Sequence, residues 1–259
     1  MFASIARPLV AAAVLSIPAG PPAWAQVDYR NLDDGRPTRV TDAYPIERFA
    51  FELSVPYRVG LRGDVARQRA APHLDYGIAP NLMIGAGLDL ALGGRGSEPS
   101  HGRLSGLWNA RRETVSFPAV SVAVEASGRS LASATVLAAA IATRSVGRSR
   151  FHANVAASLA APGNGTERTE PRWWAGVAWD RTLFRTSTVV IADLTVSRVD
   201  TGLPVEVIIG AGLRRQVTPT LVFHGGLAQG LTNSNDGLEV NLGLSHAFAV
   251  AGLMRGGRR

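Results

Sequence analysis

Hydrophobic and polar residues alternate with a period of two along the C-terminal part of this chain. Every second position from Leu238 to Leu244 is apolar, and polar or small residues such as Glu239 and Asn241 lie between. A β-strand with this pattern has one oily face and one wet face. In a soluble sandwich the oily face would line a core, whereas in a membrane barrel it would face lipid around a polar lumen.

The same alternation, read with the turn signals, predicts twelve strands. Most of them have about 9 to 11 residues, which is the length that crosses a hydrocarbon layer as a tilted strand. Strands of soluble proteins average nearer to about 5 or 6 residues. The expected spans are 46–55, 65–77, 81–92, 104–114, 118–127, 132–144, 149–160, 172–182, 186–198, 203–215, 219–230 and 237–248.

The expected connections alternate between tight and more polar or longer joints. Long polar joints are expected at 93–103 and 161–171, and short ones follow every second strand, as at 78–80 and 145–148. Outer-membrane barrels have short periplasmic turns and longer outer loops, and an even strand number puts both chain ends on the turn side. We therefore expect an all-β fold, an antiparallel transmembrane up-and-down β-barrel over 46–248.

The start of the chain predicts export. Arg7 precedes a short apolar run at 9–17, and an A-x-A site at 23–25 follows, so residues 1–25 are expected to be a cleaved signal peptide. The polar segment 26–45 is expected either to hang in the periplasm or to enter the lumen as a plug. Residues 249–259 form a tail after the last strand, and the expected location is the bacterial outer membrane.

Strand alternation also assigns the two faces of the barrel. Apolar side chains such as Leu53, Leu88, Val122, Val155 and Leu242 are expected to face lipid. Aromatic residues near strand ends are expected to form interfacial girdles, namely Tyr76, Trp108, Trp173, Trp174, Trp179 and Phe248. The expected pore-lining residues carry both signs of charge: Arg48, Glu52, Arg67, Arg69, Asp75, Asp89, Arg111, Glu113, Glu125, Asp193, Glu206, Arg214 and Glu239. The polar residues His73, Asn109, Asn154 and Asn241 are expected beside them.

Charge alone would suggest nucleic-acid binding, since the formal net charge is +7 and the sequence pI is about 11.0. The basic residues are all arginine, however, and they are scattered over strands and loops without a nucleic-acid motif. No nucleic-acid partner is expected. Arg144, Arg148 and Arg150 around one tight turn are expected to be solvated or to pair with lipid phosphates.

Candidate chemistry is sparse. The absence of cysteine excludes disulfides and thiolate sites. His152 with Ser158, and Ser245 with His246, are spaced as ordinary strand neighbours, and no i, i+2 histidine pair suggests a metal. The polar loop 233–237 lacks the glutamate that a calcium loop requires. No catalytic residue, metal or cofactor is expected.

Three segments carry a resemblance to a known family: "PHLDYGIAPNLMIGAGLDLAL" at 72–92, "LWNARRETVSFPAVSVAVEA" at 107–126 and the ending at 205–248. In these hairpins the chain resembles the outer-membrane transporters of the meta-pathway of phenol degradation family. The resemblance implies a porin-like barrel and passive diffusion of small hydrophobic, aromatic or amphipathic molecules. Two alternatives stay open: a closed structural barrel without transport, and a soluble secreted β-barrel that binds a ligand in an apolar pocket. Outer-membrane lipid, lipopolysaccharide, the barrel assembly machinery and a small-molecule substrate are the expected partners.

Overall fold

The computed structural model describes residues 28, 30–32, 37–62, 65–92, 100–129, 134–159, 173–183, 187–198, 204–232 and 237–250. The expected signal peptide and nearly all of the expected C-terminal tail lie outside these residues. No helix in the described part of the chain is long and apolar enough to cross a membrane. The described strands are β1 (Ala50–Arg62), β2 (Val65–Ala70), β3 (His73–Ala79), β4 (Leu82–Ala91), β5 (His101–Arg111), β6 (Ala119–Gly128), β7 (Thr135–Val146), β8 (Ser149–Leu159), β9 (Trp173–Leu183), β10 (Thr188–Arg198), β11 (Glu206–Thr218), β12 (Leu221–Gly230) and β13 (Leu238–Ala249).

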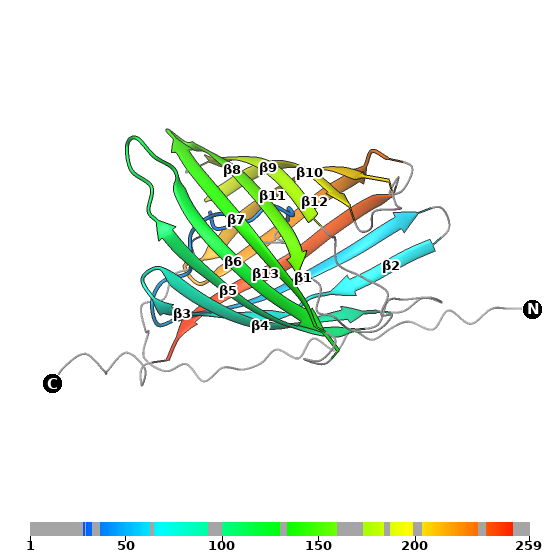
Figure 1. Ribbon diagram of the computed structural model, residues 1–259, viewed down its shortest axis with the longest axis horizontal. Helices are drawn as coiled ribbons and strands as arrows, with labels where there is room; N and C mark the ends of the chain where they lie inside the picture. Colours follow the sequence, from blue (N-terminus) through cyan, green and yellow to red (C-terminus); the bar gives the residue numbers. More distant parts are fainter. Residues whose placement is uncertain are drawn as a thin grey trace, which may run out of the picture.

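These strands form one closed antiparallel barrel (Figure 1). From β3 to β13 each strand pairs with the next along the chain, and β13 pairs with β1 from Ala50↔Ala249 to Leu61↔Leu238. Strands β2 and β3 both lie between β1 and β4, so they are two halves of a single barrel strand. The described segments therefore make twelve barrel strands, which confirms the fold predicted from the sequence.

Two prolines lie where the strand bounds depart from the expected ones. The expected strand 65–77 is split at Pro72, because proline has no N–H for the ladder. Its carbonyl still accepts a hydrogen bond from Leu88 N at 2.9 Å, which keeps the wall continuous. Strand β1 does not stop before Pro56 as expected, but continues to Arg62. The carbonyl of Pro56 accepts from Ala71 N at 3.0 Å.

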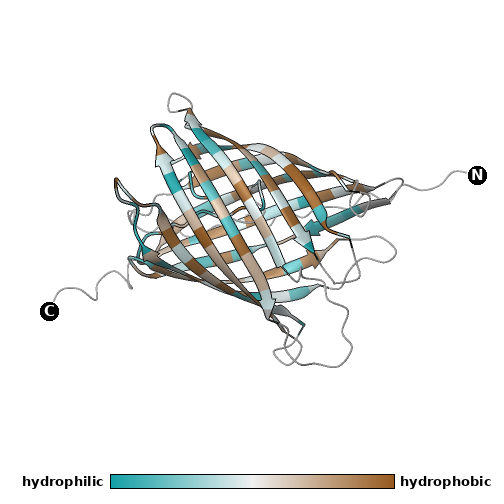
Figure 2. Cartoon of the chain, turned by 45° about the horizontal axis from the view of Figure 1, so that its top comes forward, coloured by the Kyte–Doolittle hydropathy of each residue, from teal (hydrophilic) through white to brown (hydrophobic). Residues whose placement is uncertain are grey.

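The outer surface of the barrel is apolar over its middle. Leu88, Val155 and Leu242 are 53%, 63% and 56% exposed, and each lies on the face expected to contact lipid. Brown and teal bands alternate along the strands in Figure 2, as the period of two requires. So many large apolar side chains on one continuous surface would be unfavourable in water, and they fit the hydrocarbon layer.

Candidate functional site

The N-terminal segment crosses the inside of the barrel. Asn241 Nδ2 on β13 donates to the carbonyl of Pro37 at 3.1 Å, and Arg39 N donates to Asp193 Oδ2 on β10 at 3.0 Å. On the opposite side, Asn109 Nδ2 on β5 donates to the carbonyl of Ala43 at 2.8 Å. Contacts from three sides of the wall place residues 37–45, which we call the plug, within the lumen.

Glycines in the strands leave room for the plug. A Cβ added at Gly226 would lie 2.8 Å from Cβ of Pro37, and one added at Gly176 would lie 2.8 Å from Cγ2 of Val40. Real Cβ atoms do not approach so closely, so larger residues at these two positions would displace the plug. Inward-facing glycines are the sequence signal that could have indicated a segment inside the barrel.

A buried ion cluster fastens the plug to the wall. Arg150 on β8 donates from Nη1 to Asp42 Oδ2 of the plug at 3.2 Å and from Nε to Asp180 Oδ2 of β9 at 2.9 Å. Arg150 also donates to the carbonyl of Arg30. Asp42 accepts a further hydrogen bond from Leu32 N at 3.0 Å. The three charged side chains are at most 3% exposed, so removing one would leave the others buried and uncompensated.

Arg150 was expected to be solvated or to pair with lipid phosphates, and that expectation is wrong, because Arg150 is buried. Phe151 faces outward and is 50% exposed, so alternation turns Arg150 and His152 inward. His152 completes the cluster, with Nε2 2.9 Å from Asp180 Oδ2 and Nδ1 3.0 Å from Thr143 Oγ1. Thr143 is fully buried and accepts a hydrogen bond from Ala43 N, so this Thr–His–Asp chain holds the plug and leaves no room for a substrate at the hydroxyl.

At the turn end of the barrel the plug is held by Tyr44. Its hydroxyl donates to Glu113 Oε2 at 2.7 Å, and Ser145 N donates to Glu113 Oε1 at 2.6 Å. Burial acts to raise the pKa of Glu113, but these two hydrogen bonds and the charge of Arg144 outweigh it, and the pKa is lowered. Burial and the neighbouring Glu113 raise the pKa of Tyr44. The pair is therefore a phenol donating to a carboxylate at neutral pH.

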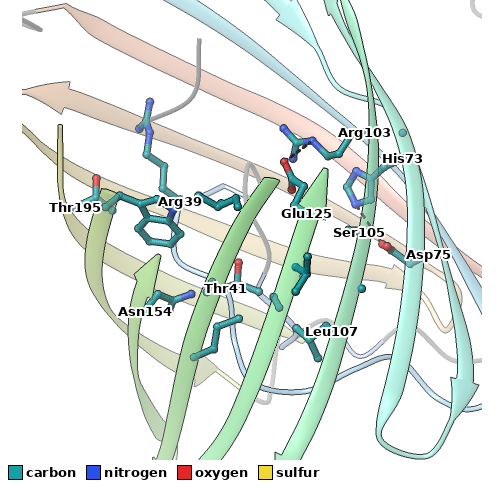
Figure 3. A pocket seen from close by; sticks show the side chains of 18 of the residues that line it. Arg39, Thr41, His73, Asp75, Arg103, Ser105, Leu107, Glu125, Asn154 and Thr195 are labelled. Carbon is teal, nitrogen blue, oxygen red and sulfur yellow. Dashed lines mark ion pairs between the residues drawn. The ribbon is translucent and has the colours of Figure 1, made fainter. Parts of the chain in front are cut away.

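A cavity of about 500 Å³, which we call the chamber, lies between the plug and the end of the barrel opposite the short turns, which we call the loop side. Arg39 and Thr41 of the plug line it together with strand residues, and Figure 3 shows the arrangement of these side chains. One wall of the chamber, on β4 to β7, is largely apolar. It is formed by Met83, Leu107, Ala123, Leu137, Ala139 and Ile141.

The chamber also carries ionic side chains of both signs. They come mainly from β13, β1, β2, β3, β5 and β6, and most are joined in pairs, two of which are drawn as dashed lines in Figure 3. The arginine–carboxylate pairs are Arg39 Nη2–Glu239 Oε2 at 2.8 Å, Arg69 Nε–Asp89 Oδ1 at 3.1 Å and Arg103 Nε–Glu125 Oε1 at 3.3 Å. His73 Nε2 lies 3.3 Å from Asp75 Oδ2. The chamber thus joins an apolar surface to a surface of paired charges.

Most of the predicted interior residues fall into two groups. Those that line the chamber are Arg69, Asp75, Glu125, Glu206 and Glu239, with His73 and Asn154. Those buried elsewhere in the barrel are Glu52, Asp89, Asp193 and Arg214, with Asn109 and Asn241. Arg67 lies in register with Gly60 near the loop end and is exposed. That these residues line a conducting pore stays a prediction.

Three residues of the predicted set lie away from the lumen. Arg48 precedes β1 and stacks on the ring of Phe49 at 4.3 Å, and Glu113 lies in the turn after β5. Arg111 faces outward, because an irregularity after Asn109 inserts one extra residue and puts Arg111 opposite Val120. Among the predicted girdle residues, Trp174 also differs, since it lines the chamber.

Metal ligation has no structural support within the described ranges, where no group of three or more His, Cys, Asp or Glu side chains could hold an ion. The residues that fasten the plug, above all Asp42, Thr143 and Asp180, were not singled out from the sequence. Their roles depend on contacts between segments that are far apart along the chain.

No protein-family model matches the chain, and no curated protein matches it in sequence. Similar solved structures are outer-membrane barrels. A KdgM porin has a TM-score of 0.57 at 7% identity, covering 75% of this chain and 99% of that one. An outer-membrane channel described as COG4313, from Pseudomonas putida F1, has a TM-score of 0.56 at 11% identity, covering 84% and 100%. A NanC porin has a TM-score of 0.55 at 8% identity, covering 76% and 98%.

At these identities the likeness concerns the fold. Together with the closed barrel and its apolar outer surface, it establishes a porin-like β-barrel of the bacterial outer membrane. A soluble secreted barrel, one of the alternatives from the sequence, does not fit such a surface. The more specific resemblance to the phenol meta-pathway family finds no matching family model.

Proposed function

We propose that this protein is a plugged outer-membrane channel for passive entry of small amphipathic molecules. The observation that carries the proposal is the chamber. This cavity of about 500 Å³ has polar and apolar walls, lies on the loop side of the barrel and is bounded by the plug. The similar solved structures include porins and a channel, which supports this class of function. Fold alone does not fix function, so the chamber must carry the argument.

The two surfaces of the chamber favour an amphipathic solute. Met83, Ala123 and Leu137, which are partly exposed, would contact its hydrocarbon part, and each Å² of apolar surface removed from water contributes about 25 cal/mol. Arg39 and Arg103 are placed to bind its polar part. They already have carboxylate partners, so a solute would exchange one partner for another rather than meet an isolated charge. Weak, exchangeable binding of this kind suits a passive channel.

Passage toward the periplasm requires the plug to shift. Val40 and Ala43 are fully buried, and they pack at the level where the chamber ends. The plug is fastened by hydrogen bonds and ion pairs to the wall and by the packing of Ala43 against Leu107 and Ile141. We therefore expect an equilibrium between a seated plug and a displaced one, with conduction through the displaced state.

A reversible crosslink tests this proposal. Val40→Cys with Gly176→Cys would place two thiols at a contact that is already close, in a chain with no other cysteine. In liposome-swelling and planar-bilayer measurements, the oxidised variant should lose solute flux, and a reductant should restore it. Val40→Cys alone under the same oxidant is the matched control, because the side chain of Gly176→Cys alone would press on Val40 Cγ2 and displace the plug.

The closed structural barrel is the rival outcome. If wild-type protein and the reduced double variant both show no flux of ions or of small amphipathic solutes, the channel proposal is refuted. If flux is equal in the oxidised and reduced states, conduction does not need the plug to move.

A further inference from the structure

The outer face of the barrel carries charge of one sign. Among the strand residues whose side chains the structure describes, no outward-facing position holds Asp or Glu. The outward-facing charged side chains are arginines: Arg111 on β5, Arg144 on β7, Arg181 on β9, Arg198 on β10 and Arg215 on β11. The interior, in contrast, holds acids and bases in pairs. Arg144 pairs with Glu113 Oε1 of the adjoining turn at 3.7 Å. The other outward-facing arginines have no carboxylate on the outer strand face within the described residues, so counterions from outside the protein can reach them.

Four of these arginines lie at one level. Arg111, Arg144, Arg181 and Arg215 all fall within the last four residues of strands that run toward the short-turn end. We call this set the arginine collar. It spans the half of the barrel from β5 to β11. The turn end also holds both ends of the barrel, where Ala50 pairs with Ala249, and short turns of outer-membrane barrels face the periplasm.

Aromatic side chains accompany the collar. The guanidinium of Arg111 lies 3.9 Å from the ring centroid of Phe117. Arg144 is opposite Phe151, and Arg215 is opposite Phe223, in the strand register. Trp179 lies two residues before Arg181 on the same face. Aromatic rings at this level mark the boundary between hydrocarbon and headgroups, so the collar lies at headgroup depth.

We propose that the arginine collar binds the phosphate groups of phospholipids in the periplasmic leaflet, with a preference for anionic headgroups. Guanidinium groups form charge-assisted hydrogen bonds to phosphate oxygens, and each aromatic neighbour supports the acyl chain or glycerol beside them. The missing acids on the outer face favour this assignment, because a lipid phosphate is the anion available there. The other half of the turn end, from β12 through β1 to β3, presents the stacked rings of Phe248, Phe51 and Tyr76 instead.

Arg144 also has a structural role, so it is kept unchanged in the variants that test the collar. It donates to the carbonyls of Thr114, Val115 and Phe117 and so holds the turn between β5 and β6. The combined variant Arg111→Gln, Arg181→Gln and Arg215→Gln removes three collar charges. It keeps the hydrogen bonds of Arg144 to that turn and loses there only the stacking of Arg111 on Phe117. The corresponding three Arg→Lys changes keep the charge but lose the planar fork. Arg58→Gln removes one charge from the chamber and is the interior control.

The experiment measures which lipids stay bound. Full-length mature protein would be folded into vesicles of equimolar phosphatidylglycerol and phosphatidylcholine, extracted gently, and examined by native mass spectrometry. Wild-type protein should retain phosphatidylglycerol in excess. Each Arg→Gln change should lower the preference for phosphatidylglycerol over phosphatidylcholine roughly fivefold at the lipid site that the arginine contacts. The lysine variant should keep most of it at low salt, and Arg58→Gln should match the wild type.

Two results would overturn the proposal: an unchanged lipid ratio in the triple glutamine variant, or no phosphatidylglycerol excess in the wild type. If the triple variant fails to fold, the single variants Arg181→Gln and Arg215→Gln decide the question in the same assay. A fall in Arg58→Gln equal to that of a collar variant would show that net charge, and not the collar, sets the preference. None of these readouts depends on solute transport.

Discussion

The two halves of the barrel interior use the same kinds of side chain in opposite ways. In the turn half, Arg150 lies between Asp42 and Asp180 with nearly no exposure, and the ions close the space around the plug. In the loop half, Arg69 pairs with Asp89 but keeps 37% of its side chain exposed beside an open cavity. The difference is what fills the lumen: a protein segment in one half, and an accessible space in the other.

This contrast shows that a list of interior charges does not define a pore. A buried ion pair costs desolvation and becomes strongly destabilising when one member is lost, whereas an exposed pair is screened and weak. We therefore expect the turn half to govern stability and the loop half to govern what passes.

The largest effect is expected at the buried cluster. Arg150→Met leaves Asp42 and Asp180 without their shared cation and should lower the free energy of unfolding by about 3 to 5 kcal/mol. Arg69→Met, in the chamber, should cost about 1 kcal/mol or less, because Arg69 is 37% exposed and the buried Asp89 keeps Arg103 Nη2 at 3.8 Å. Urea unfolding of both variants in the same vesicles measures the difference. Similar costs would mean that the two halves do not differ as described.

Charge on the lipid face should cost somewhat less. Leu242→Arg places a guanidinium on an outward position that is 56% exposed to the hydrocarbon layer, at about 2 to 4 kcal/mol near the midplane. Ser197→Arg, which adds the same group to the chamber wall, should cost much less. Neighbouring Asn241 is not a neutral control, because it holds Pro37 of the plug. Equal penalties at Leu242 and Ser197 would contradict the assignment of faces.

Ion selectivity should change when a charge of the chamber is removed, but not when a charge of the outer surface is removed. If the channel conducts, Arg69→Gln should shift its preference toward cations, because Asp89 loses the nearer of its two arginine partners and keeps only Arg103 Nη2 at 3.8 Å. Arg111→Gln should leave selectivity unchanged, since Arg111 lies on the outer face over Phe117. Reversal potentials under a salt gradient measure both. An equal shift of the reversal potential in the two variants would mean that Arg111 faces the lumen.

The smallest effect is a pH dependence at the Tyr44–Glu113 contact. Because the pKa of Glu113 is lowered from 4.5, its contribution to stability is present above about pH 4.5 and is lost as pH falls through the lowered value. Glu113→Gln should therefore be less stable than the wild type at neutral pH, with the gap closing in acid. Thermal unfolding across this range measures the gap. A gap that widened in acid would reverse the sign.

The sequence predicted the wall far better than its contents. Period-two alternation reports which face of a strand meets lipid, and that physical demand holds at Leu53, Leu88 and Leu242 without knowledge of any other segment. The expectation failed where a local irregularity changes the period, as at Arg111. The expected strand bounds were also wrong at two prolines: β1 continues through Pro56, and Pro72 divides an expected strand into β2 and β3.

The contents of the barrel depend on contacts that have no local pattern. Arg39 and Glu239 are 200 residues apart in sequence and 2.8 Å apart in space. Arg150 was read as a surface charge because its partner Asp42 lies in a segment with no strand periodicity. Alternation predicted that charges of both signs would face inward, but which of them bind the plug follows from tertiary structure alone.

The closing seam between β1 and β13 has a consequence for how the protein is made. The plug precedes β1, and β13 is the last strand, so the enclosed segment is synthesised before any of the wall that surrounds it. Pairings between residues so far apart in sequence form slowly. We expect seam formation to be the late step of assembly, and the polar contacts of residues 37–45 to be in place before it, since a completed ring would admit them only by threading. The order of the chain thus makes the plug a template around which the barrel closes.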